Sequence, residues 1–214
     1  MRSRTGNKEK SIADAAVSVF ARDGFHGARI ASIAKEAGVA TGSVYLYFRN
    51  KESILHHLFH QIWQRIRDQL VLVVNKSDKT PKEKVEDIVD RLFALFSRDP
   101  ALAQVFVNEH YLLLREGTGA FVKYYEDFLL MGEEVVRDGI RQGQFRADID
   151  PRIYSNFVFG GIRQLLQFWA RAPREYSFNS IRQRIKTIAL NGLLPQSDSH
   201  TEHVAHEQRI PATD

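Results

Sequence analysis

Hydrophobic residues recur every three or four positions along most of this chain, which is the spacing of one face of an α-helix. Residues 8–22 place Ile12, Ala15 and Phe20 on one such face, and the pattern stops before Gly24. A longer segment, residues 53–74, has its apolar positions at Ile54, Leu55, Leu58, Phe59, Ile62 and Ile66. No segment shows a convincing strand pattern. The sequence predicts an all-α protein of about nine helices.

Helix start signals divide the second half of the chain. Thr80, Pro81 and Glu83 form a capping box with a proline in the first helical turn, and predict a helix to about Arg98. Asp99-Pro100 and Asp150-Pro151 repeat the cap and proline. Further helices are predicted over residues 118–142, 150–170 and 177–194, the first ended by Gly143 and the last by Pro195.

Two short helical patterns meet at a glycine within residues 29–51. The first covers Ile30 to Ala37, and Gly38 ends it, because glycine reaches positive φ without a Cβ clash. Val39 is the expected apolar plug under the turn, and Thr41 the expected N-cap of a second helix over residues 42–47. Two helices joined by a short glycine-containing turn are typical of a helix-turn-helix for double-stranded DNA.

The second of these helices is expected to divide its side chains between core and solvent. Val44 and Phe48, four residues apart, are predicted to face inward. The residues expected to face a DNA groove are Thr41, Gly42, Ser43, Tyr45 and Tyr47. Asn50 is the predicted cap of the next helix, with Lys51 beside it as a phosphate contact. The alternative is an ordinary helical hairpin with a solvated polar face.

The charge of the chain is concentrated in this segment. Residues 1–52 contain nine Lys or Arg and five Asp or Glu, a net of +4, whereas the remainder contains 21 of each. A basic head beside a neutral body is typical of a polyanion-binding module. Arg2, Arg4, Lys8 and Lys10 are expected either to reach the DNA backbone as a flexible arm or to act only as a solubilising tail.

Composition narrows the chemistry further. The chain has no cysteine, which excludes disulfides, thiolate metal sites and cysteine nucleophiles. No segment has the apolar length of a signal peptide or a membrane span, so the expected location is cytoplasmic. His56 and His60, and the tail histidines His200, His203 and His206, lack the further ligands of a metal site, so no metal and no cofactor is predicted.

Residues 8–54 resemble the N-terminal domain of the TetR family of bacterial transcription regulators. The residues that carry the resemblance are Ile12, Ala15, Ala16, Phe20, Gly24, Phe25, Ile33, Ala34, Ala37, Gly38, Val39, Gly42, Tyr45, Tyr47, Phe48, Lys51 and Ile54. The resemblance implies a three-helix DNA-binding head over residues 1–52 and a helical effector-binding and dimerisation domain over 53–195. Residues 196–214 are predicted to be a disordered tail. Arg29 stands where many members carry a capping threonine, and is expected to reach a phosphate instead.

The body shows no catalytic grouping, so we expect no enzyme. Its aromatic residues are either ordinary core or the lining of an apolar tunnel. The segments TPKEKVEDIVDRLFALFSRDPALAQVF, GIRQGQFRADIDPR and FVFGGIRQLLQFW are similar to TetR-family regulators of fatty-acid degradation, whose effectors are long-chain acyl-CoA thioesters. This resemblance implies an acyl chain among Phe93, Phe96, Phe106, Tyr111, Phe128 and Phe168, with Arg98, Arg115 or Arg163 near the polar end.

The last two helices are expected to form a homodimer interface as a four-helix bundle. Its expected residues are Phe157, Gly160, Gly161, Leu165, Ile181, Ile185, Ile188 and Leu193. The resulting hypothesis is a repressor that binds a palindromic operator and is released by an apolar effector. The alternatives are a regulator of an efflux pump that responds to a lipophilic drug, a helical enzyme or lipid carrier whose head does not bind DNA, and an architectural nucleic-acid binder without an effector.

Overall fold

The computed structural model describes residues 3–116 and 120–195, with side chains from residue 8 to 110 and from 122 to 195. In this part of the chain all regular structure is helical, as the sequence predicts. The helices are α1 (Ser3–Gly27), α2 (Ile30–Glu36), α3 (Thr41–Val44), α4 (Lys51–Val74), α5 (Pro81–Phe96), α6 (Pro100–Glu116), α7 (Ala120–Arg141), α8 (Pro151–Arg171) and α9 (Phe178–Leu193).

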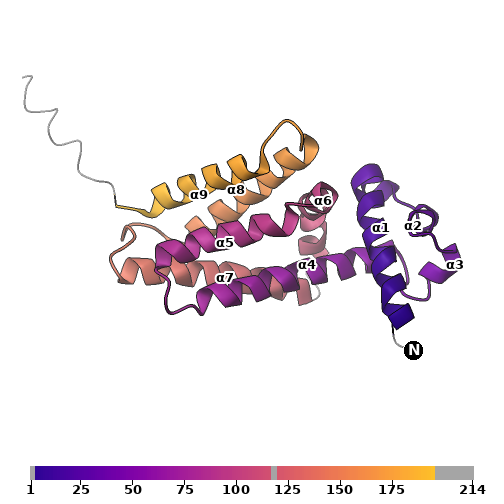
Figure 1. The fold of residues 1–214 in the computed structure, drawn as a ribbon. Coiled ribbons are helices and arrows are strands. Elements are labelled where there is room, and N and C mark those ends of the chain that lie inside the picture. Colours follow the sequence, from indigo (N-terminus) through magenta and orange to yellow (C-terminus); the bar gives the residue numbers. More distant parts are fainter. Residues whose placement is uncertain (1–2, 117–119, 196–214) are drawn as a thin grey trace, which may run out of the picture.

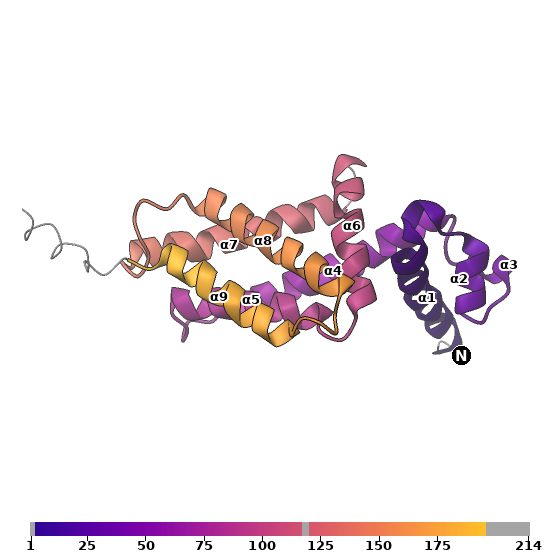
Figure 2. The same ribbon diagram turned by 90° about the horizontal axis from the view of Figure 1, so that it is seen from above.

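The molecule has a small head and a long body, and α4 runs from one into the other (Figures 1 and 2). Helices α1 to α3 form the head. In the body α4 packs against α5 and α7, and α8 packs against α6, α7 and α9. The C-terminal end of α9 lies at the end of the body farthest from the head (Figure 1). The residues expected as tail, 196–214, lie outside the described part of the chain.

Most of the predicted helix starts are confirmed by backbone hydrogen bonds. The side chain of Asn50 accepts from the N–H of Ser53 at 2.8 Å, and Thr80 and Glu83 form their reciprocal capping box. Asp99 Oδ1 accepts from the N–H of Leu102 at 2.9 Å, and Asp150 Oδ1 from the N–H of Arg152 at 2.8 Å. These side chains satisfy N–H groups that a helix start leaves open, and this fixes where each helix begins.

The start of α1 differs from the prediction. Its backbone is helical from Ser3, so the expected flexible arm is helical from that residue on; Arg2 and the side chain of Arg4 lie outside the described residues. Gly24, with φ of 70°, breaks α1 near the place where the hydrophobic pattern ends.

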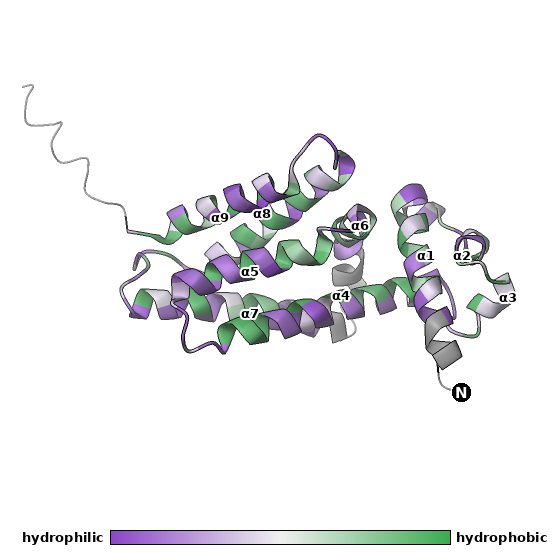
Figure 3. Cartoon of the chain, in the orientation of Figure 1, coloured by the Kyte–Doolittle hydropathy of each residue, from purple (hydrophilic) through white to green (hydrophobic). Residues whose placement is uncertain are grey.

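One continuous apolar core joins head and body. Hydrophobic and hydrophilic residues alternate along the helices (Figure 3), and most of the large hydrophobic side chains are buried. Val44 and Phe48 of the head, Ile54 and Ile66 of α4, and Phe106 of α6 all belong to the same buried cluster. A smaller cluster closes the far end of the body around Val136, Phe145 and Leu193. The described part of the head therefore has no apolar core separate from that of the body.

Candidate nucleic-acid interface and ligand cavity

The turn between α2 and α3 is built as the sequence predicts. The N–H of Val39 donates to the carbonyl of Ala34 at 3.0 Å, and Gly38 has a φ of 67°. Such a positive φ strains any residue with a Cβ, so glycine is required at this turn. Val39 is half-buried and packs against the core beneath the turn. The helix-turn-helix is therefore present.

The start of α3 corrects one prediction. Thr41 is the first residue of the helix, not its cap: Ala40 occupies the N-cap position and no side chain bonds there. The helical turns continue beyond Val44, because the N–H groups of Tyr47 and Phe48 both donate to its carbonyl at 3.0 Å. This short segment is held by its buried side chains and not by a polar cap.

The outward face of α3 and the residues after it contains three of the five expected residues in exposed positions. Thr41, Gly42 and Tyr45 are exposed as predicted, and Ser43 is half-buried. Tyr47 is half-buried and packs against the core, whereas Leu46 is 81% exposed. Helical geometry explains why Leu46 is exposed in place of Tyr47. Position 47 is three residues after the buried position 44 and lies on the same face, whereas positions 45 and 46 point away.

Exposed cations flank this face. Arg29 occupies the N-cap position of α2, where its carbonyl accepts from the N–H groups of Ser32 and Ile33, but its side chain makes no cap hydrogen bond and is exposed. Arg49, just after α3, and Lys35, in the last turn of α2, are exposed as well. Positive groups around a short outward helix are the arrangement that phosphate contacts require.

Lys51 lies in the first turn of α4 as predicted, but its side chain bonds other parts of the head. Its Nζ donates to the carbonyls of Phe25 and His26 at 2.9 Å each and to that of Ala28 at 3.4 Å. It also lies 4.9 Å from the centroid of the Phe25 ring. An ammonium group has three protons to donate, and all three have protein acceptors here. Lys51 closes the end of α1 onto α4 and is not directed to a phosphate.

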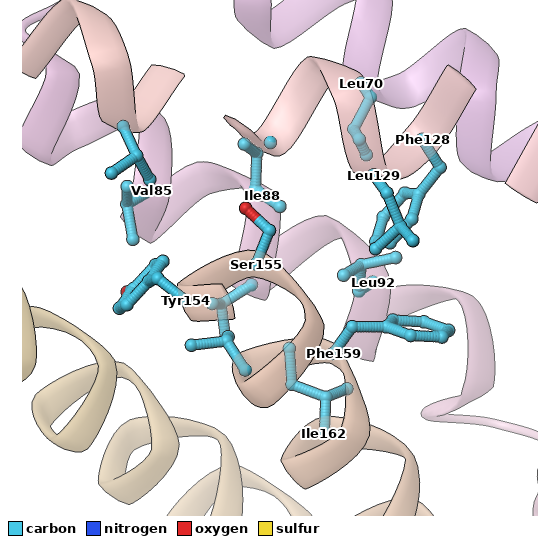
Figure 4. Close-up of a pocket in the computed structure, with 14 residues that line it drawn as sticks. Leu70, Val85, Ile88, Leu92, Phe128, Leu129, Tyr154, Ser155, Phe159 and Ile162 are labelled. Atoms are coloured by element: carbon cyan, nitrogen blue, oxygen red, sulfur yellow. The ribbon is translucent and has the colours of Figure 1, made fainter. Parts of the chain in front are cut away.

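The body contains a narrow apolar cavity between α4, α5, α7 and α8. Its volume is about 50 Å³. Val85 and Tyr154 lie at one end and Phe128 and Phe159 at the other (Figure 4). On α8 the lining extends from Tyr154 to Ile162, eight residues or about 12 Å along the helix. The cavity is therefore elongated, and its lining is almost entirely hydrocarbon.

The predicted ligand residues are only partly brought together there. Phe128 lines the cavity. Phe93, Phe96 and Phe106 are buried in the core but are not among its lining residues, and Phe96 packs on Phe106 with ring centroids 5.0 Å apart. The side chains of Tyr111 and Arg115 lie outside the described residues.

Phe168 and Arg98 correct the prediction more strongly. Phe168 is 43% exposed and packs on Tyr176 with ring centroids 4.2 Å apart, on the outer side of α8. It points away from the cavity because the inward positions of α8 are Phe159, Ile162 and Leu166. Arg98 is exposed in the turn between α5 and α6 and does not line the cavity.

An aromatic cluster that the sequence analysis did not identify adjoins the cavity. Trp63 of α4 is fully buried, and its ring lies 5.6 Å from Phe128 and 5.9 Å from Phe159. His110 of α6 is buried in the same cluster, 5.2 Å from Tyr125. Burial and, secondarily, the positive charge of Arg163 lower the pKa of His110 to about 4, so the imidazole is neutral near pH 7.

Helix α6 connects this cluster to the head. The Nε2 of Gln104 donates to the carbonyl of Ala21 in α1 at 2.9 Å. One turn further along α6, burial raises the pKa of the Glu109 carboxyl, while the charge of His26 and the N–H of Phe25 act in the opposite direction. One helix thus contacts both the aromatic cluster and the end of α1.

The predicted dimer residues lie largely on one face of α8 and α9. Phe157 is 73% exposed and Ile188 57%, and a Cβ added at Gly160 would meet no atom within 4 Å. An apolar groove of about 610 Å³ runs along this face. The half-buried residues are Gly161, Leu165 and Ile181. Ile185 and Leu193 are instead buried inside the protomer, so fewer of the predicted residues are available for a dimer interface.

Two negative findings concern the described residues alone. No three His, Cys, Asp or Glu side chains among them are grouped closely enough to hold a metal ion. None of the described helices combines the length and apolar character that a membrane span needs.

Comparison with known proteins agrees with this arrangement. Residues 12–58 match the family described as bacterial regulatory proteins, tetR family, and residues 78–193 match the tetracyclin repressor-like C-terminal domain. The fatty acid metabolism regulator protein of Bacillus subtilis is 31% identical over 193 residues, which cover 87% of this chain and 95% of that protein.

Solved structures give the same result. The fatty acid degradation regulator FadR of Bacillus halodurans is 29% identical with a TM-score of 0.74, covering 88% of this chain and 97% of that one. FadR of Bacillus subtilis, in complex with stearoyl-CoA, is 29% identical with a TM-score of 0.73, covering 86% and 98%. With both domains matched, the chain belongs to the TetR family of transcriptional regulators.

Proposed function

We propose that this protein is a homodimeric repressor that binds a palindromic operator and releases it when a long-chain acyl-CoA enters the body. The observation that carries the proposal is the elongated apolar cavity, whose end residues pack on Trp63 of α4, the helix that enters the head. The FadR relative of Bacillus subtilis, solved with stearoyl-CoA, supports this choice of effector.

The DNA contacts proposed from the geometry are the exposed residues of α3 and its flanks, together with the half-buried Ser43 between them. Thr41, Gly42, Ser43 and Tyr45 face the major groove, and Arg29 contacts a phosphate. Tyr47 and Lys51 are left out of this set, since the first packs on the core and the second bonds the carbonyls at the end of α1.

The size of the cavity suggests how the effector acts. Ligand sites usually have volumes of about 300–1,000 Å³, so 50 Å³ does not accommodate a long acyl chain. An entering chain must separate α7 and α8 from α4 and α5. The effector therefore binds the widened state in preference to the closed one, and this difference in affinity shifts the population.

The polar end of the effector is proposed to lie near the aromatic cluster. Arg163 of α8 is half-buried, and its charge acts on the neighbouring His110. A guanidinium group at the edge of an apolar lining suits a thioester oxygen or a phosphate, while the neutral His110 can donate or accept one hydrogen bond.

Two contacts are proposed to carry the change to the head. Widening at Phe128 and Phe159 displaces Trp63 on α4, and with it the head, to which the first residue of α4, Lys51, is bonded. Movement of α6 pulls on α1 through the hydrogen bond from Gln104 to Ala21. Both routes change the separation of the two heads in a dimer, which must match the half-site spacing of the operator.

The dimer is proposed to form through the exposed face of α8 and α9. Phe157, Ile188 and Ile153, which is 70% exposed, form an apolar surface along the groove described above. Gly160 allows close backbone approach from the partner, because no side chain of its own protomer fills that space. A two-fold interface of this kind requires the same patch on both copies.

The experiment is an operator-release titration. An operator selected from random duplex DNA by the full-length protein is labelled, and fluorescence anisotropy follows its release by CoA, by acyl-CoA of 8 to 18 carbons and by a lipophilic cation. Release by the long acyl-CoA alone supports the proposal. Release by the lipophilic cation alone indicates a drug-responsive regulator, and release by none of them rejects an acyl-CoA effector.

A cavity-filling variant locates the effector site. Gly132 lies in the cavity wall, and a Cβ there would approach Ser155 Oγ to 3.4 Å. Gly132→Leu fills the space as the effector is proposed to do, so operator affinity is expected to fall at least tenfold without any effector, and added acyl-CoA is expected to lower it little further. Ala94→Leu adds a comparable side chain on the exposed side of α5 and serves as the control.

A further inference from the structure

Leu46 is the most exposed large apolar side chain in the described part of the chain, at 81%. It lies beside Tyr45, which is 56% exposed, on the outward face that follows α3. An isolated exposed leucine is common on protein surfaces, but this one lies at the centre of the proposed DNA-binding face. Its position therefore calls for a specific apolar partner.

The direction of the side chain is fixed by its neighbours. Val44 and Phe48 are buried, at 0% and 4% exposure, on either side of it in the sequence. The N–H of Leu46 donates to the carbonyl of Ser43 at 3.4 Å, within the helical turns that continue to Phe48. Leu46 is presented outward by a rigid turn and not by a flexible loop.

The surroundings of Leu46 select the kind of partner. Thr41 and Gly42, one helical turn before Leu46, are exposed, and so are Arg29, just before α2, and Arg49, three residues after Leu46. The head as a whole has a net charge of +4 over residues 1–52. Exposed cations and a net positive charge in the same head are complementary to polyanionic duplex DNA, not to an apolar protein surface.

We propose that Leu46 reads the C5-methyl group of a thymine in the major groove. This methyl is the only apolar group on the major-groove edges of the four base pairs, so apolar side chains distinguish thymine there by contact. Leu46 then determines sequence specificity, while the neighbouring polar and charged side chains set position and register. The inference rests on the proposed DNA-binding function and names one element of its specificity.

The test removes the methyl group from the DNA and the leucine from the protein, separately and together. Each thymine of one half-site of the selected operator is replaced by deoxyuridine, which differs from it by that methyl alone. Affinities of the full-length protein are measured by fluorescence anisotropy at one fixed salt concentration. Leu46→Ala and Leu46→Gln are the test variants, and Leu72→Ala, at a 56% exposed leucine of the body, is the control.

When deoxyuridine replaces one particular thymine of the half-site, the affinity of the wild type is expected to fall about fourfold, because the burial of one methyl group is lost. Both Leu46 variants should show no loss at that position, and Leu72→Ala should behave as the wild type. Circular dichroism should show the variants folded, because the side chain is exposed.

Three results would overturn the inference. The wild type could bind every deoxyuridine-substituted operator as tightly as the unmodified one. The Leu46 variants could lose affinity on the same substitution as the wild type does, or could match the affinity of the wild type for every operator tested. These results differ from failure of the proposed function. If the wild type selects no operator at all, DNA binding itself is rejected.

Discussion

Replacing Lys51 with methionine separates two roles that a lysine in this motif can have. The substitution keeps an unbranched stem but removes the ammonium group. In the structure this group donates to the carbonyls of Phe25, His26 and Ala28 and lies over the Phe25 ring. We therefore expect Lys51→Met to loosen the attachment of α1 to α4, with little direct effect on phosphate contacts.

The magnitude follows from these contacts. A hydrogen bond to a charged group contributes about 1.5–3 kcal/mol, but Lys51 is half-buried and water replaces part of the loss. The cation–π contact adds about 0.5–1 kcal/mol. We expect the free energy of unfolding to fall by about 2–3 kcal/mol, which lowers the melting temperature by about 4–12 °C in a chain of this size.

The assay combines unfolding with DNA binding. Chemical denaturation gives the stability, and operator affinity at several salt concentrations gives the number of phosphate contacts. Lys35→Met, at an exposed lysine of the head, is the matched control and should leave stability nearly unchanged. Unchanged stability for Lys51→Met, together with a salt slope smaller by about one charge, would show that Lys51 contacts phosphate and refute the reasoning.

Three further predictions concern the body. His110 has a pKa of about 4 in the folded protein but about 6.5 when unfolded, so the unfolded state takes up the proton first as pH falls. Between pH 7 and 5 this lowers the free energy of unfolding by about 2 kcal/mol. Thermal melts of His110→Asn should show a smaller loss of stability over the same pH range. Gly139→Ala should destabilise by about 1–3 kcal/mol in denaturant unfolding, because its methyl would lie 2.0 Å from a ring carbon of Phe145. Phe157→Glu should give monomers in analytical ultracentrifugation, whereas Leu130→Glu, at a 55% exposed site on α7, should remain dimeric; a dimeric Phe157→Glu variant would reject the proposed interface.

Local features of this fold were predictable from the sequence because the interactions that create them are local. The side chains of Asn50, Thr80 and Asp150 each accept a hydrogen bond from an N–H two or three residues away, so a short sequence motif contains all the residues involved. Gly38 is similar, since its positive φ depends only on the turn. The buried face of α4 followed from its apolar spacing.

The errors arise where the outcome depends on distant residues or on helical phase. Lys51 bonds carbonyls more than 20 residues away, which no spacing in the sequence indicates. Phe168 and Tyr47 were assigned from residue type, although their phase places one outside the body and the other against the core. Trp63 was overlooked, although its position one residue after Ile62 in an apolar stretch was a usable signal.

The central claim is that acyl-CoA binding in the body and operator binding by the head exclude each other, because the effector prefers the widened state and the operator the closed one. Calorimetry of stearoyl-CoA binding, to the free protein and to the protein saturated with its operator, tests this claim most directly. Thermodynamic linkage requires the operator to weaken effector binding by the same factor by which the effector weakens operator binding. The account predicts matching factors of at least tenfold, and equal affinity of stearoyl-CoA for the free and the operator-bound protein would contradict it.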